Sequence, residues 1–204
     1  MPVLQTETRR HTILRAALEA FSAFGYEETS IESICRTAPA SVGSFYHHFG
    51  SKDGVAAALY AEAVDRFQSG LQAVLDEPLE PRSMVSVLVR SHLTWVRGHE
   101  LWARYLLQMG TAPATAAAQP AVTERNRALL SSIEAWAAPH IAQGVIVPLA
   151  PAALLAQILG PSYFVTKTWL AGGAEITDDL IDRFAESAWR AIDHGGSSGA
   201  SRLR

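Results

Sequence analysis

Residues 25–55 read GYEETSIESICRTAPASVGSFYHHFGSKDGV, and this short stretch decides the fold. It contains three expected helix starts, because Thr29, Ser41 and Ser51 each carry a hydroxyl of the kind that caps a helix N-terminus. Thr29 is followed three residues later by Glu32, and the two together form a capping box. The stretch therefore predicts three helices that follow one another closely.

Glycine and proline mark where the neighbouring helices should end. Residues 9–24 carry apolar side chains at three- and four-residue spacing, and Gly25 follows where a helix end needs a positive φ. The next helix should end near Thr37, because Pro39 disfavours helical geometry at Ala38. Proline is also not expected to supply a positive φ in the turn that follows. Two short helices behind a longer one have the outline of a helix-turn-helix.

Helical periodicity continues through the rest of the chain. The fourth helix should run to about Asp76, and Gly54 in its first turn should cost about 1 kcal/mol of helix stability relative to alanine. Residues 111–120, TAPATAAAQP, read as a loop because they include two prolines. Later helices are expected over residues 82–97, 101–109, 122–142, 152–171 and 178–193. The predicted fold class is all-α, with about nine helices, and a Gly/Ser-rich tail at 195–204 that is expected to be disordered.

Composition excludes several classes of protein. No apolar run in the 204 residues reaches the roughly 20 needed to cross a bilayer, and no secretory signal is visible, so a cytoplasmic protein without a membrane partner is expected. The formal net charge of −3 gives no general support for nucleic-acid binding, so any DNA contact must depend on local placement. The single Cys35 rules out a disulfide framework, and no catalytic, metal or cofactor spacing is present. The protein is therefore not expected to be an enzyme.

The motifs of residues 25–55 resemble the DNA-binding region of the tetracycline-repressor (TetR) family of transcriptional regulators. The matching parts are Gly25-Tyr26, Thr29-Ser30-Ile31, Ile34, residues 41–44, residues 45–49 and Ser51-Lys52. A departure is Pro39-Ala40, because the family usually has glycine and then a small apolar residue in this turn.

The resemblance implies a three-helix helix-turn-helix domain at residues 1–53 and a larger helical ligand-binding and dimerisation domain at residues 54–194. It further implies a homodimeric regulator, in the first place a repressor, on an inverted repeat in double-stranded DNA. A small apolar or aromatic effector would release it. The alternative is a helical small-molecule sensor or adaptor that does not bind DNA, which the altered turn and the acidic balance favour.

The expected DNA contacts lie at helix starts and on the third helix. Gly43 and Ser44 are small enough to let that helix press into a major groove, and hydroxyls at helix starts can bind phosphates. Phe45 and Phe49 are expected in the core instead. The predicted DNA-binding residues are Thr29, Ser30, Ser41, Val42, Gly43, Ser44, Tyr46, His47 and Lys52.

Aromatic residues interleaved with polar ones suggest a small-molecule pocket in the second domain. The predicted ligand-binding residues are Trp95, His99, Trp102, Tyr105, Gln108, Met109, Trp136, His140, Tyr163, Phe164 and Lys167. The plainer interpretation is that these aromatics simply fill the core. The last two helices carry wide apolar stripes, and the family uses this pair for its dimer interface. The predicted interface residues are Leu155, Leu159, Gly160, Ile181, Phe184, Ala188 and Trp189.

Overall fold

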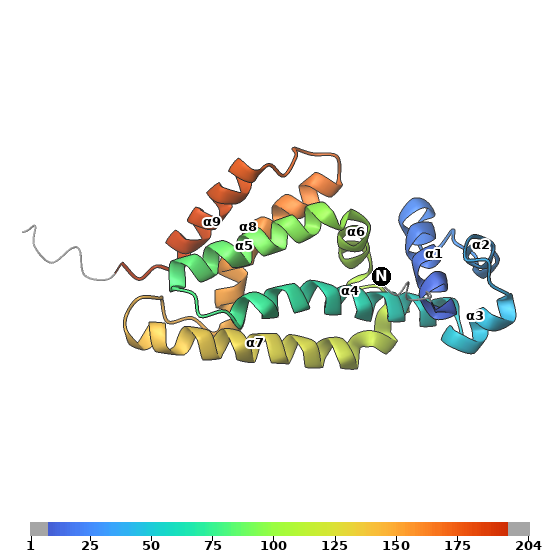
Figure 1. Cartoon of the computed structure of the whole chain (residues 1–204), viewed down its shortest axis with the longest axis horizontal. Coiled ribbons are helices and arrows are strands. Elements are labelled where there is room, and N and C mark those ends of the chain that lie inside the picture. Colours follow the sequence, from blue (N-terminus) through green and yellow to red (C-terminus); the bar gives the residue numbers. More distant parts are fainter. Residues whose placement is uncertain (1–7, 196–204) are drawn as a thin grey trace, which may run out of the picture. The chain divides into compact units, whose positions relative to one another are not determined.

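The computed structural model describes residues 8–195. Within this range the chain forms nine α-helices, one 3-10 helix and an isolated antiparallel bridge between Ile146 and Asp193 (Figure 1). No helix in the described range is long and apolar enough to cross a membrane. The predicted all-α fold class is confirmed. The predicted disordered tail lies outside the described residues, apart from Gly195.

The helices begin and end close to the predicted positions. They are α1 (Arg9–Phe24), α2 (Ile31–Thr37), α3 (Val42–Phe49), α4 (Lys52–Leu75), α5 (Pro81–Gly98), α6 (Glu100–Met109), η1 (Pro113–Ala118), α7 (Gln119–Ala142), α8 (Pro151–Leu170) and α9 (Asp178–Ile192).

The stretch 111–120 is not the predicted loop, because the 3-10 helix η1 and the first residues of α7 occupy most of it. Pro113 stands at the first position of η1, where its missing N–H removes no helical hydrogen bond. The hydroxyl of Thr115 donates to the carbonyl of Ala112 at 2.8 Å and so closes the turn. Proline at a helix start is compatible with a helix, and the prediction failed because it treated both prolines as breakers.

The chain packs as two compact units. The first comprises the described residues up to 65 together with 99–123, and the second comprises 66–98 together with 124–195. Both α4 and α7 contribute to both units. This division by packing differs from the predicted functional division at residues 53 and 54, which stays a prediction.

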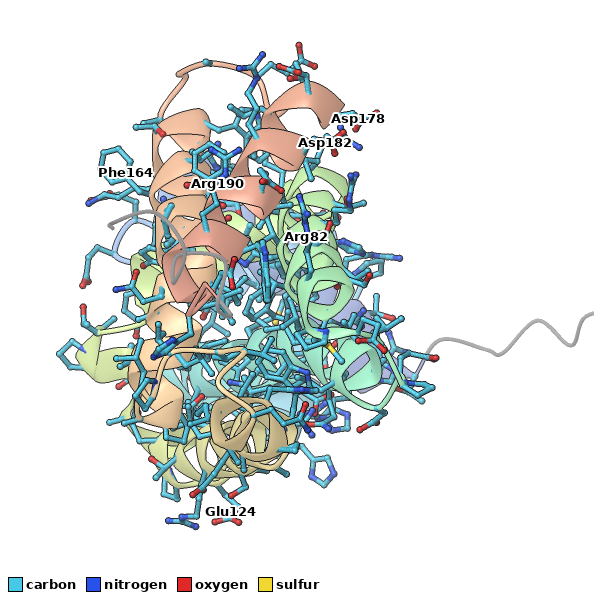
Figure 2. The ribbon with its side chains drawn as sticks, turned by 90° about the vertical axis from the view of Figure 1, so that its left-hand side faces the viewer. Arg82, Glu124, Phe164, Asp178, Asp182 and Arg190 are labelled. Carbon is cyan, nitrogen blue, oxygen red and sulfur yellow. The ribbon has the colours of Figure 1, made fainter. Side chains whose placement is uncertain are left out.

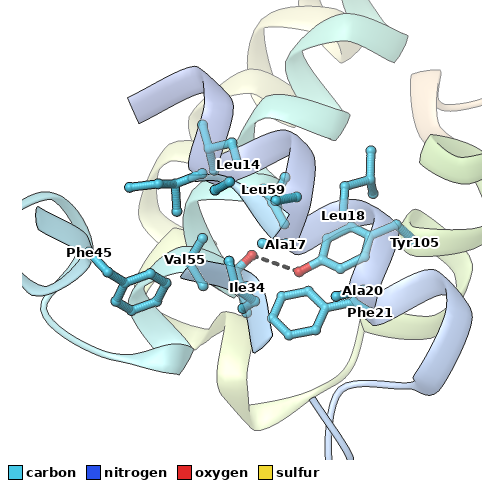
Figure 3. Close-up of a cluster of buried hydrophobic side chains, with 14 of the residues drawn as sticks. Leu14, Ala17, Leu18, Ala20, Phe21, Ile34, Phe45, Val55, Leu59 and Tyr105 are labelled. Atoms are coloured by element: carbon cyan, nitrogen blue, oxygen red, sulfur yellow. Dashed lines mark hydrogen bonds between the residues drawn. The ribbon is translucent and has the colours of Figure 1, made fainter. Parts of the chain in front are cut away.

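The core of the first unit joins the three N-terminal helices to α6 (Figure 3). Phe21 of α1, Ile34 of α2 and Phe45 of α3 are buried in a single cluster. Tyr105 of α6 is buried with them, and its hydroxyl donates to the carbonyl of Ala56 at 2.9 Å. Burial raises the pKa of Tyr105, so the phenol keeps the proton that this hydrogen bond needs. The helix-turn-helix is thereby fixed from its buried side.

In the second unit α5, α8 and α9 pack against one another (Figure 1). Ion pairs connect α5 to α9 in antiparallel order, since residues that come later on α5 meet residues that come earlier on α9. The pairs are Arg82–Glu186 at 2.6 Å, Arg90–Asp182 at 2.5 Å and Arg97–Asp178 at 2.8 Å, and Figure 2 labels Arg82, Asp178 and Asp182. Hydrogen bonds from Arg82 and Arg190 lower the pKa of Glu186, so it remains a carboxylate that accepts from both.

Candidate nucleic-acid interface and ligand cavity

The turn between α2 and α3 closes in the manner of a Schellman motif. The N–H of Ala40 donates to the carbonyl of Cys35 at 3.0 Å, and Pro39 between them has a φ of 27°. The turn thus places residue 39 at a positive φ, which the proline ring opposes, as the sequence led us to expect. The ring prefers a φ near −65°, so the turn is strained, and proline has no N–H for the carbonyl of Arg36. Arg9 braces the turn, because its Nη1 donates to the Pro39 carbonyl at 2.6 Å.

The cap of α2 is Ser30 and not the predicted Thr29. The hydroxyl of Ser30 accepts from the N–H of Ser33 at 3.1 Å, and Ser41 caps α3 as predicted. Thr29 is only 3% exposed, and its hydroxyl donates to the carbonyl of Gly25 at 2.7 Å. Thr29 therefore holds the connection between α1 and α2 from inside, and its predicted contact with DNA is wrong.

Lys52 is also turned inward, against the prediction that it binds a phosphate. Its ammonium donates to the carbonyls of Tyr26 at 2.9 Å and of Glu27 and Thr29 at 3.1 Å. It also lies 4.3 Å from the centre of the Tyr26 ring. An ammonium has three N–H donors, and all three are used within the protein. Lys52 therefore stabilises the connection between α1 and α2 in this structure, and its contact with a phosphate stays a prediction.

Tyr26 belongs to the same network. Its hydroxyl donates to the carboxylate of Asp53 in the first turn of α4. Burial and this hydrogen bond raise the pKa of Tyr26, so the phenol remains protonated. Tyr26, Lys52 and Asp53 thus fix the start of α4 against the end of α1.

One face of α3 is open to solvent. Val42, Gly43, Tyr46 and His47 are exposed, with Tyr46 at 50%, whereas Phe45 on the other side is completely buried. A Cβ added to Gly43 would meet only the Oγ of Ser41, at 4.0 Å. Packing inside the protein therefore does not require glycine at this position. The small residue leaves room for something outside the chain, as a helix that enters a DNA groove needs.

Exposed cations of α1 and α2 were not among the predicted DNA contacts. Arg9 and Arg10 at the start of α1 and Arg36 on α2 are exposed, and the Arg10 guanidinium lies 5.5 Å from the centre of the Phe49 ring. An arginine pair at a helix start close to a helix-turn-helix is the signal that could have identified them.

Glycine is required where α3 passes into α4. Gly50 has a φ of 71°, a conformation that side chains rarely adopt. A Cβ on Gly54 would overlap the carbonyl oxygen of Phe49. The expectation that Gly54 merely weakens the helix relative to alanine is therefore wrong, because only glycine lets α4 start this close to the end of α3.

A cavity of about 460 Å³ lies within the second unit, bounded by α4, α5, α7 and α8. Its walls are mostly apolar, and no charged side chain is among its lining residues. Of the predicted ligand-binding residues only Tyr163 lines it. Three predicted interface residues line it as well, namely Leu155, Leu159 and Gly160. Sequence reasoning did not assign Phe67, Leu71, His92 or Leu129 to a site, although all four line this cavity.

The other predicted ligand-binding residues lie away from this cavity. Trp102, Tyr105 and Met109 belong to the first unit's core, and His99 and Gln108 are exposed residues of that unit. In the second unit Trp95 packs edge-on against Phe67, and Trp136 contacts His140. Phe164 and Lys167 are exposed on α8. The plainer interpretation, in which aromatics fill the core, therefore holds for Trp102 and Tyr105.

The predicted interface residues divide in the same way. Ile181 and Ala188 are 2% and 3% exposed, because they face the core of their own unit, so their prediction as interface residues is wrong. Gly160 is exposed with no atom within 4 Å of an added Cβ, and Phe164, on the outer side of α8, is 66% exposed (Figure 2). Leu155, Phe184 and Trp189 are half-buried, whereas Leu159 is nearly covered.

His92 is the one histidine buried in the second unit. Its Nε2 lies 3.3 Å from the Oγ1 of Thr166, and its ring packs edge-on against Phe67 with 5.3 Å between ring centres. Burial lowers the pKa of His92 to about 4, so the imidazole is neutral at pH 7. Its Nδ1 is buried and has no hydrogen-bond partner among the described residues. No cluster of three metal-ligating side chains occurs between residues 8 and 195.

Residues of the first unit are similar to a known protein family. Residues 13–59 match the family model described as "Bacterial regulatory proteins, tetR family". The HTH-type transcriptional regulator UidR of Escherichia coli strain K12 is 34% identical over 93 residues, which are 45% of this chain and 45% of UidR, so the match spans about half the length of that relative. The HTH-type transcriptional regulator RutR of the same strain is 24% identical over 192 residues, covering 92% of this chain and 90% of RutR.

A solved structure extends the likeness in fold to nearly the whole chain. A TetR family transcription regulator from Marinobacter aquaeolei VT8 superimposes with a TM-score of 0.75 at 19% identity, over 91% of this chain and 95% of that chain. The match to the family model falls on the helices that include α3, and the likeness to this solved structure is one of fold.

Proposed function

We propose that this chain, whose residues 13–59 match the family model of tetR bacterial regulatory proteins, is a transcriptional regulator that reads DNA with α3. The exposed face of α3 carries the proposal, since Val42, Gly43, Tyr46 and His47 are open to solvent inside the family-matched residues 13–59. The curated relatives named above are regulators and not enzymes, in agreement with the expected non-catalytic role.

The contacts with DNA would be of two kinds. A helix fits a major groove about 12 Å wide, where Tyr46 and His47 would reach base edges or phosphates. Ser30 and Ser41 stand at exposed helix starts, where hydroxyls and backbone N–H groups suit phosphate oxygens. Since Lys52 is occupied, Arg10 and Arg36 would supply the charged contacts. Few cations imply a shallow dependence of binding on salt concentration.

The proposed binding form is a homodimer on an inverted repeat. A two-fold axis presents two identical α3 helices to two half-sites, and their spacing follows from the geometry of the dimer. Occupation of such an operator would block transcription, which makes repression the first expectation. The exposed side of α8, with Gly160 and Phe164, supports an interface there.

An effector would act through the cavity of the second unit. Its 460 Å³ fall within the range of roughly 300–1,000 Å³ that is usual for small-molecule sites. The single helix α4 begins directly after α3 and contributes Phe67, Gln68 and Leu71 to the cavity wall. A ligand that prefers one position of α4 would shift the dimer between two states, by no more than its difference in affinity for them.

The test is selection of bound sequences from a random duplex library at two salt concentrations. The wild type should enrich an inverted repeat, and Tyr46→Ala should bind that repeat at least about fivefold more weakly, since one lost contact is worth about 1–3 kcal/mol. Phe24→Ala is the matched control, because Phe24 is another exposed aromatic of the first unit that lies off α3. It should retain binding, and all three proteins should have the same oligomeric state in gel filtration.

A sensor or adaptor that does not bind DNA is the second candidate. The strained turn at Pro39 and the internal role of Lys52 are the observations that favour it. Absence of any enriched sequence at low salt, from a folded dimer, would make this candidate the better one.

A further inference from the structure

His92 connects the cavity of the second unit to α8. It is one of the residues that line the cavity, and it is only 5% exposed. A buried polar atom without a hydrogen bond is costly, so such atoms in folded proteins nearly always have a partner. What the two ring nitrogens bind therefore decides what the cavity can hold.

Counting protons fixes the tautomer of the ring. The hydroxyl of Thr166 donates its only proton to the carbonyl of Ser162, at 3.0 Å, within α8. Its oxygen is left to accept from the Nε2 of His92, 3.3 Å away, so Nε2 carries the imidazole proton. Because the ring is neutral, Nδ1 has no proton and offers a lone pair.

No group of the protein uses that lone pair. Nδ1 has no hydrogen-bond partner among the described residues. The two amide side chains of the cavity wall are engaged with each other, since Nε2 of Gln68 donates to Oδ1 of Asn126 at 2.6 Å. Apart from His92 itself, the polar residues of the wall are Gln68, Asn126 and Tyr163, and none of the three is hydrogen-bonded to Nδ1; the remaining lining residues, such as Phe67 and Leu71, have no side-chain donor.

We propose that this cavity takes a neutral, largely apolar molecule that carries a hydroxyl or N–H group, and that Nδ1 of His92 accepts the hydrogen bond from that group. A charged ligand is disfavoured, because no lining residue carries an opposite charge and a buried ion without a partner is expensive. A molecule with acceptors alone would leave Nδ1 unsatisfied. This inference rests on the proposed effector cavity and adds the chemistry of the ligand.

The test compares two probes that differ in one donor. 2-Naphthol has a hydroxyl proton, and 2-methoxynaphthalene has the same rings and oxygen without it. In calorimetric titrations of the full-length chain, the naphthol should bind about tenfold more tightly, the ratio that corresponds to 1.4 kcal/mol. Equal affinities within about twofold, or no binding of either probe at millimolar concentration, would overturn the inference.

Two variants assign the preference to His92. His92→Phe keeps a flat ring and removes the acceptor, so the naphthol should lose its advantage while the ether binds as before. His140→Phe is the matched control, since His140 belongs to the same unit but does not line the cavity, and it should keep the wild-type preference. A preference that survived in folded His92→Phe protein would contradict the assignment.

A measurement on the wild type covers the case in which His92→Phe does not fold. The nitrogen-15 resonance of Nδ1 should shift when naphthol is added, as an accepted hydrogen bond requires, and should not shift with the ether. If the chemical shift of Nδ1 did not change with either probe although the naphthol binds, the inference would also be overturned.

The outcome is independent of DNA binding. A chain that prefers naphthol but selects no DNA sequence would contradict the proposed regulator and support the ligand class. A chain that selects an operator but binds both probes with equal affinity would support the proposed regulator and contradict the ligand class.

Discussion

Two residues of the helix-turn-helix bind groups within the protein, although their residue types suggested contacts with DNA. Thr29 and Lys52 both bind backbone carbonyls of the connection between α1 and α2. Helix periodicity could not reveal this, because the carbonyls lie on a loop more than twenty residues before Lys52 in sequence. Tyr46 and His47, by contrast, are exposed as expected. The exposure of Tyr46 and His47 agrees with the contacts predicted there, which stay predictions, whereas the side chains of Thr29 and Lys52 are hydrogen-bonded within the protein.

Pro39→Gly should stabilise the first unit. Glycine adopts a φ of 27° without ring strain and returns an N–H for the carbonyl of Arg36. Relief of a strained backbone residue is worth about 1–3 kcal/mol, and the greater freedom of glycine in the unfolded chain offsets about 0.4–1 kcal/mol of it. Thermal unfolding followed by circular dichroism should show a rise in Tm. A fall in Tm would mean that the turn does not hold proline under strain.

At the scale of elements, helix boundaries followed from local sequence but helix neighbours did not. The wide apolar stripe of α9 indicated contact with both its own domain and a partner, and the structure shows that Ile181 and Ala188 pack inside their own unit. Acidic residues on the other side of α9 pair with arginines of α5, including Arg90 with Asp182. Each exposed pair contributes little free energy, and together they specify the register of the two helices. An apolar stripe indicates that a helix has a buried face, but it does not indicate which element covers that face.

Gly54→Ala should destabilise the junction of α3 and α4. The added Cβ meets the carbonyl oxygen of Phe49, so α3 or α4 must shift, and overpacking of this kind costs about 1–3 kcal/mol. Urea unfolding should show a lower midpoint. Gly43→Ala is the matched control, because its Cβ meets almost nothing and alanine favours a helix by about 0.5–1 kcal/mol. If both variants were equally stable, the close approach at Gly54 would be refuted.

At the scale of the whole molecule, the functional claims depend on two surfaces that single helices do not define. The cavity gathers residues from four helices, and the proposed dimer would use the exposed side of α8. The oligomeric state and the pH dependence of stability are the two properties that test the proposed interface and the burial of His92 in the cavity wall.

Phe164→Glu should convert the proposed dimer into a monomer. Phe164 is 66% exposed on α8, and a buried carboxylate at an interface would lack a partner. Light scattering after gel filtration should show at least a tenfold weaker dimer. Phe24→Glu, at a similarly exposed aromatic in the first unit, should leave the dimer intact. A dimer that tolerated both changes would place the interface elsewhere.

Stability should fall in mild acid because of His92. Its pKa in the folded protein, about 4, lies below the ordinary 6.5, so between these values the unfolded chain binds a proton that the folded chain does not. The free energy of unfolding is therefore not reduced by His92 above pH 6.5, and it decreases as the pH falls from 6.5 toward 4. Between pH 7 and pH 4 wild type should lose about 3 kcal/mol more than His92→Phe in urea unfolding. Parallel losses in the two proteins would show that His92 is not buried as a neutral ring.

The sequence by itself determined the fold class, nearly all helix boundaries, the resemblance of residues 25–55 to a known family of regulators and the exposed face of α3. These depend on signals within a few residues of one another, such as the cap at Ser41 and the φ of Gly25. Only the tertiary structure decided that Lys52 binds carbonyls of the protein, that Gly54 leaves no room for a Cβ beside the Phe49 carbonyl and that His92 lines the cavity. Those properties depend on contacts between residues that are distant in sequence. Helical periodicity shows which face of a helix is apolar, but it does not show which element packs against that face.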